Sequence, residues 1–438
     1  MGLPDRKDVP VQQTWDVGIL YENDDAWQKD IEAEKKALAD FSKYDQKLND
    51  PETIIAALDD LGEMEVRMDQ LGHYGFLQQS TDMTDPHYNQ LLRILDQLDA
   101  DYNAELAKYR AQIMDNDNET LDAVSDKRPD LGAAIREFKR IKKHRLSCEV
   151  ESALSSLEPT LSSFEGIYTT CRAADMSFPD FEVDGKTYPL SFVLYENSYQ
   201  YNPDHKLRHA AFKAFSKVLN QYKNTVAANY YAQVSKEKNM ATLRGYDSVF
   251  DYLLDDQEVP REFFDRQIDV IIEKLGPVMQ KYVKLIQKER GLDKLTFSDL
   301  QIDLDPEFAP KVPLDKAPEY ISDAIKILGP KYHDMIMKCF DERWVDFPAN
   351  KGKETGGFET TPYGKHAYIL MSWTDEMADV YTLVHELGHA GQEMLTNKTN
   401  HPLSCGVSTY IVEAPSTFNE LLLTHALEEK SSDKRMQR

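Results

Sequence analysis

Apolar residues recur at helical spacing along most of this chain. In the stretch 86–114, for example, Leu91, Leu95 and Leu98 lie three and four positions apart and would form one face of a helix. Asn23, Asp24 and Asp25 are candidate caps for the first long pattern, and Pro51 suits the start of the second. The same spacing predicts helices over 27–47, 51–79, 86–114, 121–143, 147–171, 207–243, 261–290 and 318–339.

Two short segments break the helical pattern and predict strands. Alternating residues flank Asp184 and Gly185, which indicates a β-hairpin over 181–188. The glycines at the start of 356–373 suit a bend, and its last six residues favour a strand. That strand leads into a helical run over 379–395, with Thr374 as its predicted N-cap. The sequence therefore predicts a mostly α protein with a small β region next to the 379–395 helix. We expect three regions: an N-terminal helical region (1–115), a second helical region ending in the hairpin (116–195) and a third region (196–438).

The composition fits a globular protein and narrows the range of its partners. The chain has 438 residues, of which 41% are apolar, enough for a large core. A net charge of −25 argues against nucleic acid and anionic membranes as partners. No apolar stretch has transmembrane length, and no signal-peptide core is visible near the first residue. The wide spacing of the four cysteines favours reduced thiols in a cytoplasmic protein: Cys148, Cys171, Cys339 and Cys405.

The main chemical signal is a His-Glu-Leu-Gly-His motif, the HExxH pattern, at residues 385–389. Histidines four positions apart share one helix face, so His385 and His389 can bind one metal ion. Glu386 lies beside them, where it can take a proton from a metal-bound water. This pattern predicts a catalytic zinc site, although cobalt or manganese can occupy such ligands.

Glu413 is the predicted third ligand of this site. Glu413 and Glu420 are seven positions apart and project from the same side of a predicted helix, whose apolar face continues over 421–426. We expect Glu413 to bind zinc and Glu420 to orient one of the ligand histidines. This prediction places Pro415 in the first turn of the helix, where proline is tolerated.

Other donors after the motif are less suitable. A longer histidine motif is excluded, because Gln392 and Leu395 stand where a further glycine and histidine would be needed. His401 and Cys405, in the intervening loop, stay rival donors. His401 precedes a proline in a polar turn, and an unpaired cysteine is usually a small buried apolar residue. Three protein ligands and one open position would complete a catalytic zinc site.

Three stretches of the chain resemble the thimet-oligopeptidase family of zinc metallopeptidases, and in particular its oligoendopeptidase F branch with the bacterial group B oligopeptidases. They are residues 368–375, 379–389 and 412–420, and weaker similarity at 15–27, 208–215 and 243–246 extends it over nearly the whole chain. The resemblance implies a multi-helical, zincin-type peptidase with zinc at the base of an enclosed channel that admits short peptides. It also implies that one zinc ion is bound by His385, His389 and Glu413, and that Glu386 is the general base.

The chain departs from this family pattern after the Glu413 helix, because the sequence stops at Arg438. Family members continue with a helical segment that closes the channel and supplies a tyrosine and a histidine to the substrate. We therefore expect an incomplete channel and a catalytic region, 196–438, that is shorter than in the family.

Substrate contacts are expected from the segment before the motif helix, because a strand beside the metal can pair with an extended peptide. Candidates for substrate binding or for donation to an oxyanion are Gly357, Tyr363, His366, Tyr368 and Tyr410. The predicted activity is zinc-dependent hydrolysis of internal bonds in short oligopeptides, with no covalent enzyme intermediate. Three alternatives stay open: zinc and peptide binding without turnover, a helical fragment that does not hold zinc firmly, and a carboxypeptidase or peptidyl-dipeptidase on a similar scaffold.

Overall fold

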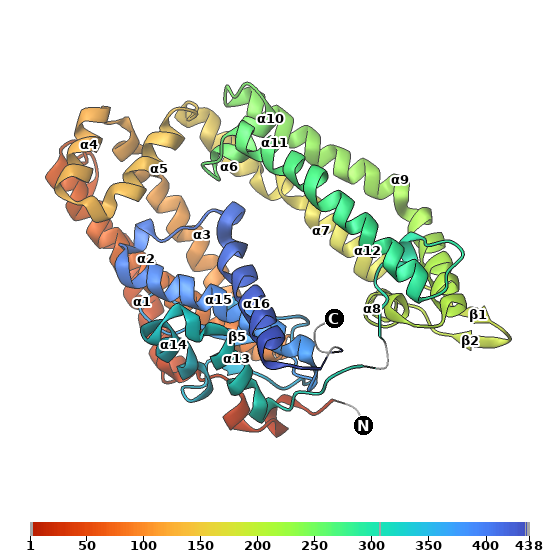
Figure 1. Cartoon of the computed structure of the whole chain (residues 1–438). Helices are drawn as coiled ribbons and strands as arrows, with labels where there is room; N and C mark the ends of the chain where they lie inside the picture. Colours follow the sequence, from red (N-terminus) through yellow and green to blue (C-terminus); the bar gives the residue numbers. More distant parts are fainter. Residues whose placement is uncertain (1–2, 306–307, 434, 436–438) are drawn as a thin grey trace. The chain divides into compact units, whose positions relative to one another are not determined.

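The computed structural model describes residues 3–305, 308–433 and 435 and divides into two compact units. Unit 1 contains Met1–Lys143 and Ala309–Gln437, and unit 2 contains His144–Phe308. Unit 1 is thus built from two separate stretches of chain. The three continuous regions expected from the sequence, with boundaries at 115 and 195, stay a prediction. Both units are mainly helical, as the sequence indicated (Figure 1).

Unit 1 carries most of the sheet structure and both helices predicted to hold the metal. Its α-helices are α1 (Asp24–Asp40), α2 (Pro51–Thr81), α3 (Pro86–Asp115), α4 (Asn118–Lys127), α5 (Gly132–Lys142), α13 (Ala317–Ile325), α14 (Pro330–Met337), α15 (Met377–Thr399) and α16 (Thr409–Lys430). Its strands are β3 (Val345–Asp346), β4 (Phe358–Thr360) and β5 (Tyr368–Leu370), in the order β3-β5-β4. β3 is parallel to β5, and β4 is antiparallel to it, with Phe358 opposite Leu370.

The small sheet lies between two parts of the core of unit 1. Ile369 of β5 belongs to one apolar cluster with Val380, Leu383 and Val384 of α15. Tyr368 belongs to a second cluster, in which Trp15 packs edge-on against its ring at 6.0 Å. Because β5 is buried on both faces, it fixes the start of α15 against the first stretch of chain.

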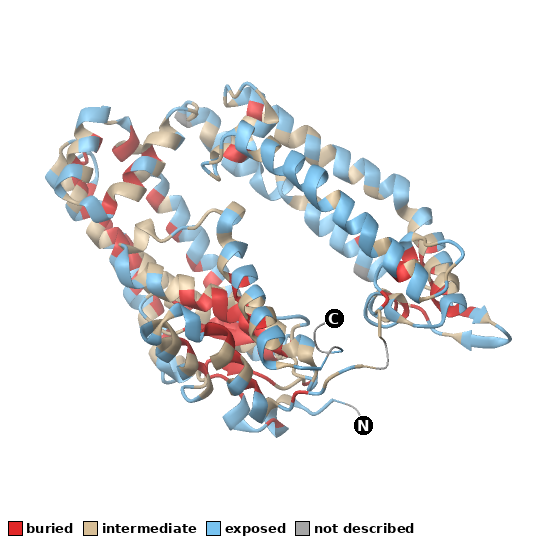
Figure 2. Cartoon of the chain, viewed as in Figure 1, coloured by how far each residue is buried: buried red, intermediate tan, exposed pale blue. Residues whose placement is uncertain are grey.

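Unit 2 contains the longest helix and the predicted hairpin. Its α-helices are α6 (Cys148–Leu161), α7 (Ser163–Thr170), α8 (Phe192–Asn197), α9 (His205–Leu243), α10 (Val249–Asp255), α11 (Arg261–Val270) and α12 (Gly276–Glu289). The strands β1 (Phe181–Val183) and β2 (Lys186–Tyr188) pair antiparallel. Asp184 and Gly185 both have positive φ, 48° and 77°, as a tight hairpin turn requires. The surfaces of α9, α11 and α12 are largely exposed (Figure 2).

Several helix boundaries predicted from the sequence are wrong. The helix expected over 121–143 is two helices, because the chain turns at Arg128 and Pro129 starts a short 3-10 segment. The helix expected over 147–171 is divided at Ser162 into α6 and α7. The helix expected over 318–339 is broken at Gly329, whose φ of 92° is incompatible with a right-handed helix. The strand expected over 368–373 ends at Leu370.

A buried ionic cluster attaches the first residues of the chain to the sheet. Asp346 of β3 is fully buried and accepts hydrogen bonds from Arg6, at 2.5 and 2.9 Å, and from Lys353 Nζ at 2.6 Å. Lys353 Nζ also donates to the carbonyls of Asp346 and Pro348. Burial lowers the pKa of Lys353, so its charged form depends on these partners.

Lys353→Met is expected to lower the free energy of unfolding by at least about 1 kcal/mol, because buried acceptors lose their donor. Chemical denaturation monitored by circular dichroism would measure the change. Lys351→Met is the matched control, since Lys351 forms an exposed ion pair with Asp5 at 2.8 Å and such pairs contribute about 0–1 kcal/mol. Equal effects of the two substitutions would contradict a structural role for the buried cluster.

Among the residues whose side chains the structure describes, Cys171, Cys339 and Cys405 have free thiols; the first two are buried and Cys405 is half-buried. A cytoplasmic location stays a prediction. Within the described residues, no helix is both long enough and apolar enough to cross a membrane.

Candidate metal centre

The N-cap of the motif helix α15 lies two residues after the predicted one. Glu376, not Thr374, is the N-cap, because the Asp379 carboxylate accepts the Glu376 backbone N–H at 2.9 Å in a capping box. Thr374 instead donates its own N–H to Asp379 at 2.7 Å. The apolar face of α15 is buried, and its opposite side carries His385 and His389, which are 26% and 13% exposed.

The second helix of the site, α16, packs against α15 at a glycine. A Cβ at Gly388 would lie 2.6 Å from Ser416 Cα and 2.7 Å from the Pro415 carbonyl oxygen, so only glycine fits without a shift. Asn419 donates its side-chain N–H to the Val384 carbonyl at 3.1 Å, which fixes the two helices along their length. The predicted position of Pro415 is wrong: α16 begins at Thr409, and the proline lies inside the helix.

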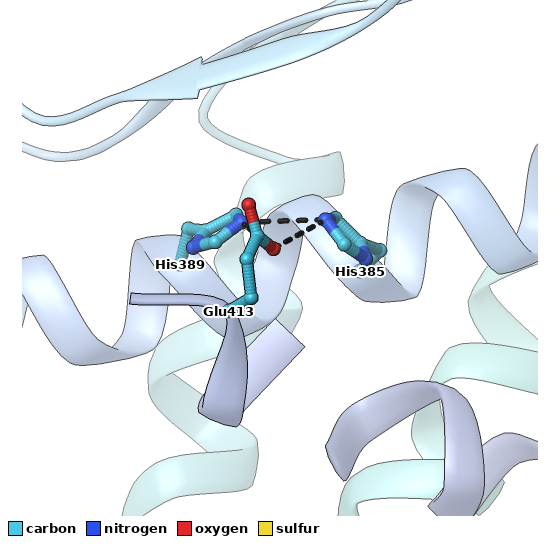
Figure 3. A group of neighbouring side chains, drawn as sticks. All are labelled: His385, His389 and Glu413. Atoms are coloured by element: carbon cyan, nitrogen blue, oxygen red, sulfur yellow. Dashed lines mark hydrogen bonds and ion pairs between the residues drawn. The ribbon is translucent and has the colours of Figure 1, made fainter. Parts of the chain in front are cut away.

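This packing brings the three predicted zinc ligands together (Figure 3). His385 Nε2 and His389 Nε2 are 3.3 Å apart, and each lies 3.3 Å from Glu413 Oε2. Zinc–ligand bonds of about 2.0–2.1 Å in a tetrahedron place the ligand atoms roughly 3.3–3.4 Å from one another. The three donor atoms therefore have the spacing of one face of a zinc tetrahedron, and their types suit zinc.

Neighbouring side chains orient two of these donors. Glu420 Oε1 accepts the N–H of His385 Nδ1 at 2.6 Å, so Nε2 of the same ring faces the cluster. Ser416 Oγ donates to Glu413 Oε2 at 2.8 Å. This hydrogen bond, with the nearby histidines, lowers the pKa of Glu413 and keeps it ionised. Burial lowers the pKa of His389, which favours the neutral imidazole that a metal requires.

Glu386 lies next to this cluster in a water-poor environment. Glu386 is only 8% exposed. Burial raises the pKa of its carboxyl group to about 7; the nearby His385 lowers this pKa, and the negative charge of Glu413 raises it. A carboxyl group with a pKa near neutrality can both take and return a proton, which is the property of a general base.

The candidate substrate residues have different surroundings. Gly357 lies beside Glu386, since a Cβ at this position would be 3.8 Å from Glu386 Oε1. Tyr410 is half-buried in the first turn of α16, shortly before Glu413. His366 stacks on Trp344 in the core, at 5.3 Å between ring centroids, and its Nδ1 donates to the Ala367 carbonyl.

Two further candidates also have partners within unit 1. The Tyr368 hydroxyl donates to the Asp16 carbonyl at 2.9 Å, and the Tyr363 hydroxyl donates to the Asn400 carbonyl at 2.8 Å. The rival donor His401 packs over Gly62 and lies 3.7 Å from Asp59. Cys405 Sγ donates to the His401 carbonyl. Among the described residues, the one group of three potential ligands within mutual reach is His385, His389 and Glu413.

Sequence reasoning missed the residues that support the ligands. Ser416, Asn419 and Gly388 have no metal-binding chemistry, yet they hold Glu413 and α16 in place. The role of Ser416 could have been predicted, because it follows Glu413 by three positions and residues at this spacing lie on the same side of a helix.

Comparison with known proteins agrees with this fold. The family model described as Peptidase family M3 matches residues 198–438, and that described as Oligopeptidase F matches 104–178. The fold defined by helices and a small sheet is that of a solved Chlamydophila abortus structure, with a TM-score of 0.83, 21% identity and coverage of 99% of this chain and 73% of that one. The crystal structure of oligoendopeptidase-F from Enterococcus faecium gives a TM-score of 0.63 at 20% identity, over 94% and 69% of the two chains.

Two proteins with similar sequences are named oligopeptidases. Oligopeptidase PepF of Bacillus subtilis is 29% identical over 427 residues, and Group B oligopeptidase PepB of Streptococcus agalactiae is 25% identical over 438 residues. The matches cover 96% and 98% of this chain but 63% and 72% of the relatives, so the chain spans less than two thirds of the Bacillus protein. The chain belongs to Peptidase family M3. Within that family it falls in the oligopeptidase F branch, which confirms the resemblance and the mostly helical fold.

Proposed function

We propose that this chain is a zinc-dependent endopeptidase that hydrolyses internal bonds of short oligopeptides. The observation that carries the proposal is the triangle of His385 Nε2, His389 Nε2 and Glu413 Oε2, with three sides of 3.3 Å. These three residues would hold one zinc ion, and Glu386 lies beside them. The names of the relatives, oligopeptidases and oligoendopeptidases, support short peptides as substrates.

Each residue of the site has a separate role in this proposal. A zinc ion held by His385, His389 and Glu413 would lower the pKa of a water molecule and polarise the scissile carbonyl. Glu386 takes the proton of the attacking water and later gives it to the leaving amine. Glu420 fixes His385 by its hydrogen bond, and Ser416 fixes Glu413. Among the predicted substrate contacts, Gly357 is best placed, because its backbone runs beside Glu386.

A second candidate function is binding of zinc and peptide without turnover. The observation that favours it is the triangle of donor atoms itself, which can hold a metal ion whether or not Glu386 transfers a proton. The two candidates share the metal site and differ in whether peptide bonds are broken.

Cleavage of an internally quenched peptide with both ends blocked separates these candidates. The purified chain would be depleted of metal with a chelator, reloaded with zinc and assayed, with metal quantification and mass spectrometry of the products. We expect one zinc per chain and zinc-restored cleavage at internal bonds. One zinc per chain without cleavage would favour the binding function, and cleavage confined to free-ended peptides would indicate an exopeptidase. Absence of bound zinc would refute both candidates.

A further inference from the structure

The segment around β4 runs alongside the metal-binding helix. Gly357, Glu359 and Thr361 alternate along it and face α15. A Cβ at Gly357 would lie 3.3 Å from Thr382 Cγ2 and 3.8 Å from Glu386 Oε1. Two helical turns further on, the Thr361 backbone N–H donates to Glu393 Oε2 at 3.2 Å. The segment therefore follows the same side of α15 that carries Glu386.

Thr361 holds two carboxyl groups at once. Its hydroxyl donates to Glu359 Oε1 at 2.5 Å, while its backbone N–H donates to Glu393. The other oxygen of Glu359, Oε2, is buried and has no hydrogen-bond partner. Because one small residue contacts both groups, the two carboxyls of these half-buried residues lie close together.

Among the described residues, the surroundings of this pair hold one group that can carry positive charge, His73. In the part of the chain that the structure describes, no lysine or arginine forms an ion pair with Glu359 or Glu393. The charged or titratable groups facing the pair are Glu386 on α15 and Asp69 and His73 on α2. His73 Nδ1 donates to the Asp69 carbonyl, and its Nε2 lies 2.7 Å from Thr360 Oγ1. Against the effect of burial, the Asp69 carboxylate raises the pKa of His73, and the charge of His73 in turn lowers the pKa of Glu393, in opposition to the effect of burial on that group.

Two ionised carboxylates at this place would repel each other without water to screen them. One proton on the pair removes that repulsion and also supplies the donor that the unpartnered oxygen of Glu359 needs. Burial raises the pKa of both groups, and the charge of Glu393 raises the pKa of Glu359 further.

We propose that Glu359 and Glu393 share one proton, and that this pair, bridged by Thr361, holds β4 against α15 and so positions Gly357 beside Glu386. The two glutamates are positioning residues in this scheme, since neither belongs to the metal triangle. The consequence for catalysis rests on the proposed peptidase function, whereas the shared proton and the attachment of β4 do not.

The sign of the pH dependence follows from the raised pKa values. Between the pKa of an unfolded glutamate, about 4.3, and the higher pKa of the folded pair, the folded state binds more protons than the unfolded state. Stability therefore falls as pH rises through this window, and the loss is complete above the folded pKa. A glutamine at position 359 keeps a neutral donor at every pH and removes the loss.

Thermal unfolding of Glu359→Gln and of the wild-type chain at about pH 5 and about pH 9 tests the shared proton. We expect equal melting temperatures at the lower pH and a variant more stable by roughly 2–4 °C at the higher pH. Glu32→Gln, at an exposed position of α1, is the control and should show no pH-dependent difference. A Glu359→Gln variant that is less stable at both pH values, or unchanged at both, would overturn the proposal.

Kinetics of the same variants test the positioning role. If the zinc-loaded chain cleaves peptide, the decrease of kcat/KM at alkaline pH should lie at higher pH in Glu359→Gln than in the wild type, with equal zinc content. An unchanged pH profile would refute the positioning role. If the pH profile is unchanged and Glu359→Gln loses a preference of the wild type for peptides that contain lysine or arginine, the two glutamates bind substrate and do not position β4. If neither chain cleaves peptide, the proposed function fails, and the melting temperatures still decide the shared proton.

Discussion

Glu386→Gln is expected to reduce the rate of peptide cleavage by about 10²- to 10⁴-fold, the range attributed to a general acid–base group. The amide has nearly the same shape as the carboxyl group but does not accept a proton from water. The three ligand atoms are left in place, so zinc binding should persist at one ion per chain. Comparing kcat of the zinc-loaded proteins, together with metal analysis, measures both effects.

The stability of this variant provides an independent check. Burial raises the pKa of Glu386 to about 7, so in zinc-depleted protein its ionisation above the unfolded pKa costs stability. The glutamine variant should therefore melt at the same temperature as the wild type or higher at neutral pH. Glu63→Gln, on an exposed part of α2, is the matched control and should leave cleavage unchanged. Cleavage by Glu386→Gln at the wild-type rate would exclude Glu386 as the general base.

Gly388→Ala is expected to lower the free energy of unfolding by about 3 kcal/mol, the upper part of the range for overpacking. The new methyl group would meet the backbone of Ser416 and Pro415 at 2.6–2.7 Å, and backbone cannot move aside as a side chain can. Separating α16 from α15 would also carry Glu413 away from the histidines. Zinc affinity should therefore fall together with stability, as measured by denaturation and by competition with a chelator.

Gly72→Ala is the matched control for this prediction. Gly72 also lies within a helix, α2, but a Cβ there would have no atom within 4 Å. Alanine is favoured over glycine in a helix by about 1 kcal/mol, so this variant should be slightly more stable than the wild type. A stable, zinc-binding Gly388→Ala variant would mean that the two helices tolerate a wider separation.

The parts of the site that follow from local chain geometry were predictable. His385, Glu386 and His389 lie within about one turn of α15, and Glu413 and Glu420 lie about two turns apart on α16, so the relative directions within each set depend only on helical periodicity. The predicted hairpin at Asp184 and Gly185 is also local, since two adjacent residues decide the turn.

Features that depend on competing local contacts or on distant residues were not predictable. The N-cap of α15 is Glu376 instead of Thr374 because the Asp379 side chain binds both backbone N–H groups and the helix starts at the nearer one. The contact of Thr361 with Glu393 requires the register of β4 along α15, which no periodicity in the sequence encodes. Pro415 within α16 is tolerated in a helix that begins earlier than the apolar pattern indicated.

The division of unit 1 into two stretches of chain has a consequence for synthesis on the ribosome. Trp15 of the first stretch packs against Tyr368 of the second, and all of unit 2 lies between them in the sequence. At a synthesis rate of about 5–20 residues per second, roughly 10 s or more pass between the completion of the first stretch and the synthesis of β5. During that interval its apolar residues lack their packing partners, and a chaperone can bind them. Unit 2 can fold before unit 1, which contains the metal site, is complete.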